Sequence, residues 1–516
     1  MRHPRFSTSA TLIPTLLALA VVPRLGAADG DAPAPAPAPA TTPSLEERVQ
    51  ALDQEIKILK RKAEIAAEDA AAKAKSSAPA GAAAPADGGG QPRVTANPRD
   101  GFTIGSADGL YKLRLGGYVQ ADGRFFVNDD NRGDGPKTNL TDNFTIRRAR
   151  VQLDGSFYDL FDFRLQYDFG GATPQLVDAY VTTKIDPALR ITAGHFKAPF
   201  GLEFLQTDTN CAFVERGLPT NLVPWRDTGV QVGGDLWNGA VNYAVGIFSG
   251  TTDGTNRDVD SSDDKDLVAR LFLTPFKNTG IDALSGLGFG VAGSEGLDDP
   301  VFGTSAAGAA VVGTSDLPKF VSAGQNSFFS YNADAGGNPA TGATAIARGK
   351  HLRWSPQLFW TWGPWSLLSE YVLSKQRVEL LNAAHPAGGG SSGYVTNQAW
   401  QVESGYLLTG DKASFTGVVP NSPVGSGGWG AWEVVARFER LIVGASAFEN
   451  GYANIAKSAR AATGVGVGVN WWLNRNLKIQ LDYERTAFEG GANGSAVDPA
   501  DRQTEHTIET RLQVVF

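Results

Sequence analysis

The stretch that decides the fold is residues 161–169, Phe-Asp-Phe-Arg-Leu-Gln-Tyr-Asp-Phe, in which every odd-numbered residue is apolar and every even-numbered residue is polar or charged. Side chains of a β-strand point alternately to its two faces, so this stretch predicts a strand between an apolar and an aqueous environment. The same period of two recurs at 477–484 and 509–516. Alternation by itself fits a soluble sandwich as well as a membrane barrel.

The lengths of the connections distinguish these two folds. The pattern predicts sixteen strands, at about 111–126, 143–156, 161–169, 177–185, 189–197, 228–237, 240–249, 266–274, 284–293, 349–362, 365–378, 397–409, 431–443, 459–473, 477–488 and 504–516. Connections after even-numbered strands are mostly short, and those after odd-numbered strands are mostly long, up to 294–348. Short turns on one rim and long loops on the other are typical of an up-and-down outer-membrane barrel. Two connections, 170–176 and 410–430, break this rule, so a strand near either one could be miscounted.

Residues 101–516 are therefore predicted to form an all-β fold, a 16-stranded antiparallel transmembrane β-barrel. A β-protein spans a bilayer only as a closed barrel, because every backbone donor and acceptor needs a partner. Barrels of 16 to 18 strands enclose an aqueous channel. Tryptophans gather at the predicted strand ends, as at 360–365 and 471–472, which is typical of interfacial girdles.

The first hundred residues divide into four predicted parts. Residues 1–28 have the charged start, the short apolar run and the small residues of a secretory signal peptide, with an uncleaved periplasmic anchor as the alternative. An Ala/Pro linker follows at 29–43, and 70–100 are predicted to be a flexible linker. Between them, residues 44–69 repeat apolar residues at spacings of four and three, which predicts a periplasmic coiled-coil helix. A single amphipathic helix lying on another surface stays open.

Composition excludes several classes of protein. The chain has one cysteine, Cys211, and five histidines, which argues against disulfide frameworks, metal centres and iron–sulfur clusters. A net charge of −8 argues against nucleic-acid binding. No phosphate loop, nucleophile elbow or zinc-protease helix is present, so we expect neither an enzyme nor a cofactor or metal site.

Several segments resemble one family, the phosphate-selective porins O and P. They are residues 194–203, 213–219, 226–230, 406–410, 430–437 and 511–516, in the family's order. The resemblance implies a trimeric, 16-stranded outer-membrane channel with an N-terminal periplasmic extension, whose third extracellular loop folds inward to narrow the pore. The terminal Phe516 resembles the signal read by the barrel-assembly machinery.

Candidate pore residues follow from this resemblance and from strand parity. The third loop, 198–227, has basic residues at or near its ends. The alternation of side chains along the predicted strands places four more arginines on the lumen-facing side of the wall. The seven candidates are Lys197, Arg216, Arg226, Arg114, Arg148, Arg150 and Arg164. The acids near them are Glu203, Asp208, Glu215 and Asp227 in the loop, and Asp154, Asp162 and Asp168 on the wall. Either the cations form an anion-attracting stripe beside a constriction, or they belong to salt-bridged networks that stiffen the barrel wall.

The sequence therefore predicts an outer-membrane porin for passive diffusion of small hydrophilic solutes, with an anion or phosphate preference as a hypothesis. The expected partners are further copies of the chain in a homotrimer, outer-membrane lipid, small anionic or hydrophilic solutes and, through the coiled coil, the cell wall. The expected location is the bacterial outer membrane, with the N-terminal helix in the periplasm. The alternatives are a tether between outer membrane and cell wall whose barrel is mainly an anchor, and a secreted soluble β-protein.

Overall fold

The computed structural model describes residues 91–97, 101–127, 140–171, 173–256, 263–299, 302–304, 310–312, 315–333, 342–492 and 500–516. The signal peptide, the Ala/Pro linker and the coiled-coil helix predicted in residues 1–69 therefore lie outside the described residues. So does the predicted flexible linker at 70–100, apart from 91–97.

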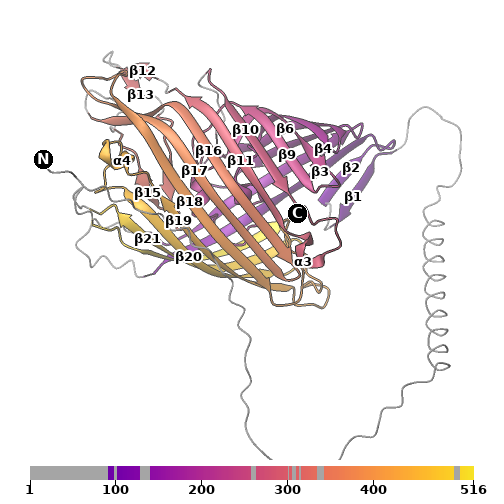
Figure 1. Cartoon of the computed structure of the whole chain (residues 1–516). Coiled ribbons are helices and arrows are strands. Elements are labelled where there is room, and N and C mark those ends of the chain that lie inside the picture. The colour runs from indigo at the N-terminus through magenta and orange to yellow at the C-terminus, as the bar shows by residue number, and fades with distance from the viewer. Residues whose placement is uncertain are drawn as a thin grey trace, which may run out of the picture. The chain divides into compact units, whose positions relative to one another are not determined.

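Within the described residues, sixteen antiparallel strands close into a barrel (Figure 1). They are β3 (Tyr111–Phe126), β4 (Asn143–Phe157), β5 (Phe161–Asp168), β6 (Gln175–Asp186), β7 (Leu189–Lys197), β8 (Arg226–Leu236), β9 (Val241–Phe248), β10 (Asp266–Leu273), β11 (Gly288–Asp298), β16 (Thr344–Trp362), β17 (Trp365–Leu381), β18 (Ser391–Leu407), β19 (Ala431–Ile442), β20 (Ala459–Trp472), β21 (Leu477–Gly490) and β22 (Glu505–Val515). The barrel closes where β22 pairs with β3, with Val514 opposite Val119. Each of the sixteen strands overlaps its predicted range, so the predicted fold is confirmed for this part of the chain.

Two details differ from the predictions. Strands β1 (Arg93–Asn97) and β2 (Gly101–Gly105) form a hairpin that pairs with the start of β3, so β1 lies where a flexible linker was predicted. The strand predicted to begin at 284 begins at Gly288, because a short helix, α3 (Asp282–Ser285), precedes it. Two connections, 170–176 and 410–430, break the rule of short turns and long loops. Their described residues, between β5 and β6 and between β18 and β19, contain no additional strand.

The two faces of the wall follow the alternation read from the sequence. On β5, Leu165 and Tyr167 are 45% and 41% exposed on the outer face, whereas Gln166 is 4% exposed on the inner face. Near the rim of short turns, the rings of Trp432 and Trp471 stack with centroids 4.9 Å apart. This arrangement is the reverse of a soluble core, and it suits a wall with lipid outside and polar groups inside. None of the helices in the described part of the chain is long and apolar enough to span a bilayer.

The short elements lie in the longer connections. They are α2 (Leu202–Leu205) and η1 (Leu218–Leu222) between β7 and β8, β12 (Phe302–Thr304), β13 (Ala310–Val312), β14 (Lys319–Val321) and β15 (Ser327–Ser330) between β11 and β16, and α4 (Ser446–Glu449) between β19 and β20. The α2–η1 connection determines the shape of the lumen.

Candidate functional site

The connection between β7 and β8, residues 198–225, folds into the barrel as the family resemblance implied; we call it the constriction loop. Its apolar side chains Phe200, Phe213, Leu218 and Leu222 are at most 2% exposed. Loops normally lie on the surface because their backbone groups need water or a partner. Here the barrel wall supplies those partners.

Carboxylates on the wall opposite β3–β8 accept hydrogen bonds from the loop backbone. Leu202 N donates to Glu370 Oε2 at 2.7 Å, Val214 N to Asp482 Oδ2 at 2.6 Å, and Leu218 N to Glu439 Oε2 at 2.7 Å. These three acids belong to β17, β21 and β19. The loop is therefore held against the β17–β22 half of the barrel.

Glycine on the inner wall makes this close approach feasible. A Cβ at Gly466 of β20 would lie 2.9 Å from the ring of Phe213 and 3.0 Å from Glu484. The Phe213 ring in turn lies 4.3 Å from the Arg437 guanidinium carbon. Side chains on this face of β20 would push the constriction loop away from this wall, toward strands β3–β8.

Many acids, seven on the barrel wall and Glu203 on the constriction loop itself, are buried where the loop meets the wall. The set is Glu203, Glu370, Glu403, Glu433, Glu439, Asp482, Glu484 and Glu509, each at most 7% exposed. Arg437 lies among them, with its guanidinium near Glu203, Glu439 and Glu484. The chain has 54 acids against 46 bases, and part of this acidic surplus is covered by the constriction loop.

Three cavities lie on the other side of the loop, against β3–β8. The outer cavity, about 390 Å³, is lined by Arg148, Arg216 and Gln325 among others; the central one, also about 390 Å³, by Tyr118, Lys197 and Thr207; and the inner one, about 590 Å³, by Lys112, Asp162 and Arg190. Outer and central cavities share Arg150, Asp208 and Arg226, and central and inner cavities share Arg114, Arg164, Tyr180 and Thr182. The shared residues make the cavities a series from the long-loop rim to the short-turn rim.

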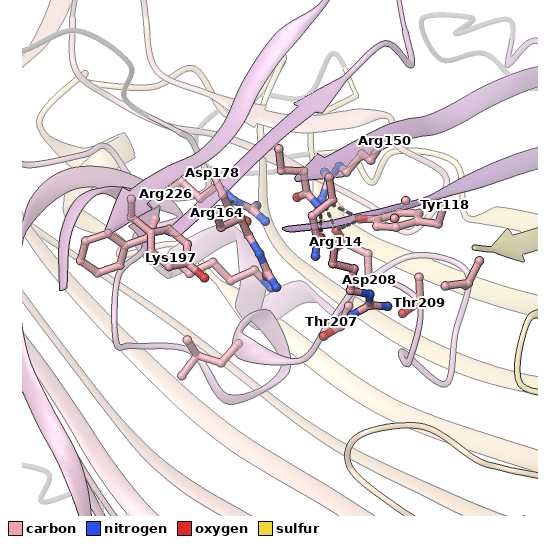
Figure 2. Close-up of a pocket in the computed structure, with 18 of the residues that line it drawn as sticks. Arg114, Tyr118, Arg150, Arg164, Asp178, Lys197, Thr207, Asp208, Thr209 and Arg226 are labelled. Carbon is pink, nitrogen blue, oxygen red and sulfur yellow. Dashed lines mark hydrogen bonds and ion pairs between the residues drawn. The ribbon is translucent and has the colours of Figure 1, made fainter. Parts of the chain in front are cut away.

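The seven candidate residues all line this series, and Figure 2 shows five of them around the central cavity. Arg114, Arg150, Arg164, Lys197 and Arg226 line the central cavity, and Arg148 and Arg216 line the outer one. Each cavity has five basic residues. The acids number three in the outer cavity and two in each of the others.

Four further cations were missed by the sequence reasoning. Lys112, Lys184 and Arg190 line the inner cavity, and Arg147 lines the outer one. Strand parity could have identified the first three, because they share a face with Arg114, Tyr180 and Thr192. Arg147 could not be found in this way, because the register between β3 and β4 shifts beside it.

Asp208 of the constriction loop is the acid shared by the outer and central cavities. Its carboxylate lies 2.5 Å from Arg150 Nη1, 2.5 Å from Arg216 Nη1 and 3.7 Å from Arg148 Nε, and it accepts a 2.8 Å hydrogen bond from the Tyr118 hydroxyl. Burial opposes its ionisation, but Arg148, Arg216 and Arg150 outweigh burial and hold the pKa of Asp208 well below its usual value. Asp208 is therefore a fixed negative charge among three arginines.

The other candidates also have partners within the barrel. Arg164 contacts Asp154 at 2.7 Å, and Arg226 contacts Asp178 at 2.8 Å. Lys197 Nζ donates to the carbonyl of Gln206 at 2.9 Å, so its ammonium binds the constriction loop. The cations are held in networks and line the cavities at the same time.

An aromatic ring organises the cations at the loop. The Phe204 ring has Lys197 Nζ at 4.9 Å, and the guanidinium carbons of Arg216 and Arg226 at 5.4 and 5.9 Å, from its centroid. The Trp225 ring stacks against the Phe204 ring, with the two centroids 5.5 Å apart. Cations are attracted to an aromatic face, so Phe204 helps to keep three like charges close together.

The next loop, at 249–256, holds the end of the constriction loop in place. Gly254 N donates to the Val223 carbonyl at 2.9 Å, and Arg226 N donates to Asn256 Oδ1 at 3.2 Å. Asp253 anchors this loop to the barrel wall through Arg353 Nε at 2.5 Å and His351 Nε2 at 3.3 Å. Burial raises the pKa of Asp253, but Arg353 and His351 outweigh burial and lower it to about 2.

Cys211 and the histidines do not form a reactive or metal-binding site within the described residues. Cys211 is 3% exposed, and burial raises the pKa of its thiol. In that part of the chain, no group of three or more His, Cys, Asp or Glu side chains is arranged to hold a metal ion.

Comparison with known proteins places this geometry in a family. Residues 119–516 match the model of the family described as phosphate-selective porin O and P. The chain belongs to this family. It is 24% identical over 447 residues to Porin O of Pseudomonas aeruginosa, a match that covers 82% of this chain and 92% of the relative. The family and the closed barrel identify this porin as a channel of the bacterial outer membrane.

Solved structures of other outer-membrane proteins are similar at low identity. The outer membrane channel DcaP of Acinetobacter baumannii matches with a TM-score of 0.47 and 11% identity, over 80% of this chain and 99% of that chain. OmpT of Vibrio cholerae, in a structure described as the trimer form, matches with a TM-score of 0.46 and 9% identity, over 79% of this chain and 99% of that chain.

Proposed function

We propose that this porin conducts small anions, phosphate among them, by passive diffusion between the constriction loop and strands β3–β8. The observation that carries the proposal is the surplus of basic residues in each of the three consecutive cavities. A narrow aqueous path with low-dielectric walls strengthens the field of the charges along it. Anions are therefore concentrated in this path relative to cations.

The network of acids among the cations sets how strongly an anion is held. Conduction requires a site that attracts an ion and also releases it. Asp208 and Asp178 neutralise part of the charge of Arg150 and Arg226, so the remaining field attracts an anion without trapping it. The acids behind the constriction loop are separated from the path by the loop itself, which weakens their influence on a passing ion.

The reversal potential of purified wild-type protein in a planar bilayer, under a tenfold KCl gradient, tests the anion preference. We expect a potential of the sign set by chloride. A clear potential of the opposite sign would refute the proposal.

The chloride conductance, measured while phosphate is added in steps, then tests whether phosphate binds in the path. Saturable reduction of the current at low phosphate supports a phosphate site in the path. A current that changes only in proportion to bulk ion concentration would leave a general anion pore.

We also propose how the chain assembles. The homotrimer stays a prediction from the family resemblance, and chemical crosslinking of the detergent-extracted protein, giving trimers as the largest product, would support it. Tethering to the cell wall stays a prediction about residues 44–69, which lie outside the described residues.

A further inference from the structure

A group of arginines lies on the outer face of β19–β21, toward the rim of long loops. Arg440 Nη2 lies 2.6 Å from Glu489 Oε1, and Arg460 Nε lies 3.4 Å from Glu489 Oε2. The Arg485 side chain is exposed and makes no hydrogen bond or ion pair with another described residue. We call Arg440, Arg460, Arg485 and Glu489 the basic cluster. One carboxylate for three guanidinium groups leaves two positive charges on this part of the outer wall.

An apolar groove of about 930 Å³ lies on the same outer wall, nearer the short turns. Its lining includes Val434, Ala436, Val467, Leu481, Tyr483 and Ile508. The groove reaches the basic cluster at its upper end, since Tyr483 is two residues from Arg485 on β21 and its hydroxyl lies 2.7 Å from Nδ1 of His506, the residue paired with Arg485. Apolar groove and basic cluster therefore form one continuous surface.

The position of the cluster along the strand corresponds to the edge of the membrane. On β19, Arg440 is eight residues from Trp432, whose ring belongs to the aromatic pair near the short-turn rim. Eight residues of strand are about 26 Å long, which at a tilt of about 40° is about 20 Å of height. The apolar band of such barrels is about 25 Å tall, and arginine side chains extend toward the headgroups. Because the long-loop rim faces outward from the cell, the guanidinium groups reach the outer leaflet.

We propose that this surface binds one outer-leaflet lipid whose head carries phosphate groups, of the lipid A type. The phosphates would pair with the guanidinium groups of the basic cluster, and an acyl chain would lie in the groove. Guanidinium groups match phosphate oxygens in charge and in bidentate geometry. The charge of the cluster selects this occupant over a second barrel, because another apolar wall would fill the groove and leave Arg485 without a counter-charge.

Native mass spectrometry of the full-length protein in detergent, titrated with bisphosphorylated lipid A, tests the proposal. We expect wild type to retain the lipid and the Arg440→Gln/Arg485→Gln variant to bind it about tenfold more weakly or worse, because two charged contacts are lost. Ala436→Trp fills the groove without changing charge and should also weaken binding. Lipid A with its phosphates removed should bind wild type and the double variant alike.

The matched control is Arg377→Gln, which removes an exposed arginine from β17, separated from the cluster by β18. Its affinity for lipid A should equal that of wild type, and the heat-dependent shift of folded barrels in SDS gels should confirm that every variant is folded. Equal lipid A affinity of wild type and the double variant would overturn the proposal. Loss of the native oligomer in the double variant, with lipid binding unchanged, would also overturn it and identify the surface as a subunit interface.

Discussion

The charge of Asp208 should set the ion selectivity of the pore more than that of other acids. Asp208 lies at the junction of the outer and central cavities and contacts Arg148, Arg150 and Arg216. The substitution Asp208→Asn removes one negative charge while keeping the size of the side chain. Arg150 still has Asp168 at 2.7 Å, and Arg216 still donates to the Gln206 carbonyl at 2.9 Å, so we expect the loop to stay in place.

The size of the effect follows from Coulomb's law. An ion that passes about 8 Å from the removed charge, in water-like surroundings, changes its energy by about 0.5 kcal/mol. The change favours anions and disfavours cations, so the two effects combine to about 1 kcal/mol, which is about fivefold in the chloride-to-potassium permeability ratio. The local field also weakens at high salt, so the shift should be larger at 0.1 M than at 1 M KCl.

Reversal potentials of wild type and variant in the same KCl gradient measure this ratio. Glu295→Gln is the matched control, because Glu295 pairs with Lys350 at 2.9 Å and both side chains are more than half exposed, outside the cavity series. It removes the same charge and should leave the ratio unchanged. A ratio that does not move in Asp208→Asn, or that moves toward potassium, would refute the reasoning.

Three further outcomes follow from the same contacts. Arg164→Gln, in the central and inner cavities, should lower the chloride-to-potassium ratio, and an unchanged reversal potential would count against a path through them. Gly466→Val should displace Phe213 and destabilise the barrel by about 1–3 kcal/mol, seen as a lower unfolding temperature in SDS gels; wild-type behaviour would show that the loop does not need this glycine. Asp253 has a folded pKa of about 2 against its ordinary 3.8, so its contribution of about 2 kcal/mol is complete above pH 3.8 and is lost as pH falls toward 2. Asp253→Asn should therefore be less stable than wild type at pH 6, and denaturant unfolding should show the difference disappearing by pH 2; a difference independent of pH would contradict this assignment.

The sequence was sufficient to predict which residues of the barrel wall face inward and which face outward, because neighbouring residues alone determine the two faces of a strand. The alternation at 161–169 places Arg164 inside and Leu165 outside from neighbouring residues alone, and the turn lengths determine which rim is which. The same parity placed Arg114, Arg148 and Arg150 on the lumen side. The hairpin of β1 and β2 was missed because two five-residue strands next to a low-complexity stretch have too few residues for a periodic pattern.

The distribution of charge exposed to the lumen could not be predicted from the alternation of the strands. Parity indicates that Glu370 and Asp482 face inward, but not that the constriction loop covers them through hydrogen bonds to Leu202 and Val214. These partners are 168 and 268 residues apart in the chain. The structure buries many acids behind the constriction loop. A charge count along the chain therefore understates the positive character of the open path.

Cysteine accessibility in single channels is the most direct test of where the ion path lies. In a Cys211→Ala background, Arg164→Cys introduces a thiol on the cavity side of β5 and Leu165→Cys a thiol on its outer face. A negatively charged methanethiosulfonate reagent added to the bath should abruptly lower the anion current of the Arg164→Cys channel and leave the Leu165→Cys channel unaffected. Current that responds at position 165 and not at position 164, or no current from the folded protein at all, would contradict a water path between the constriction loop and strands β3–β8.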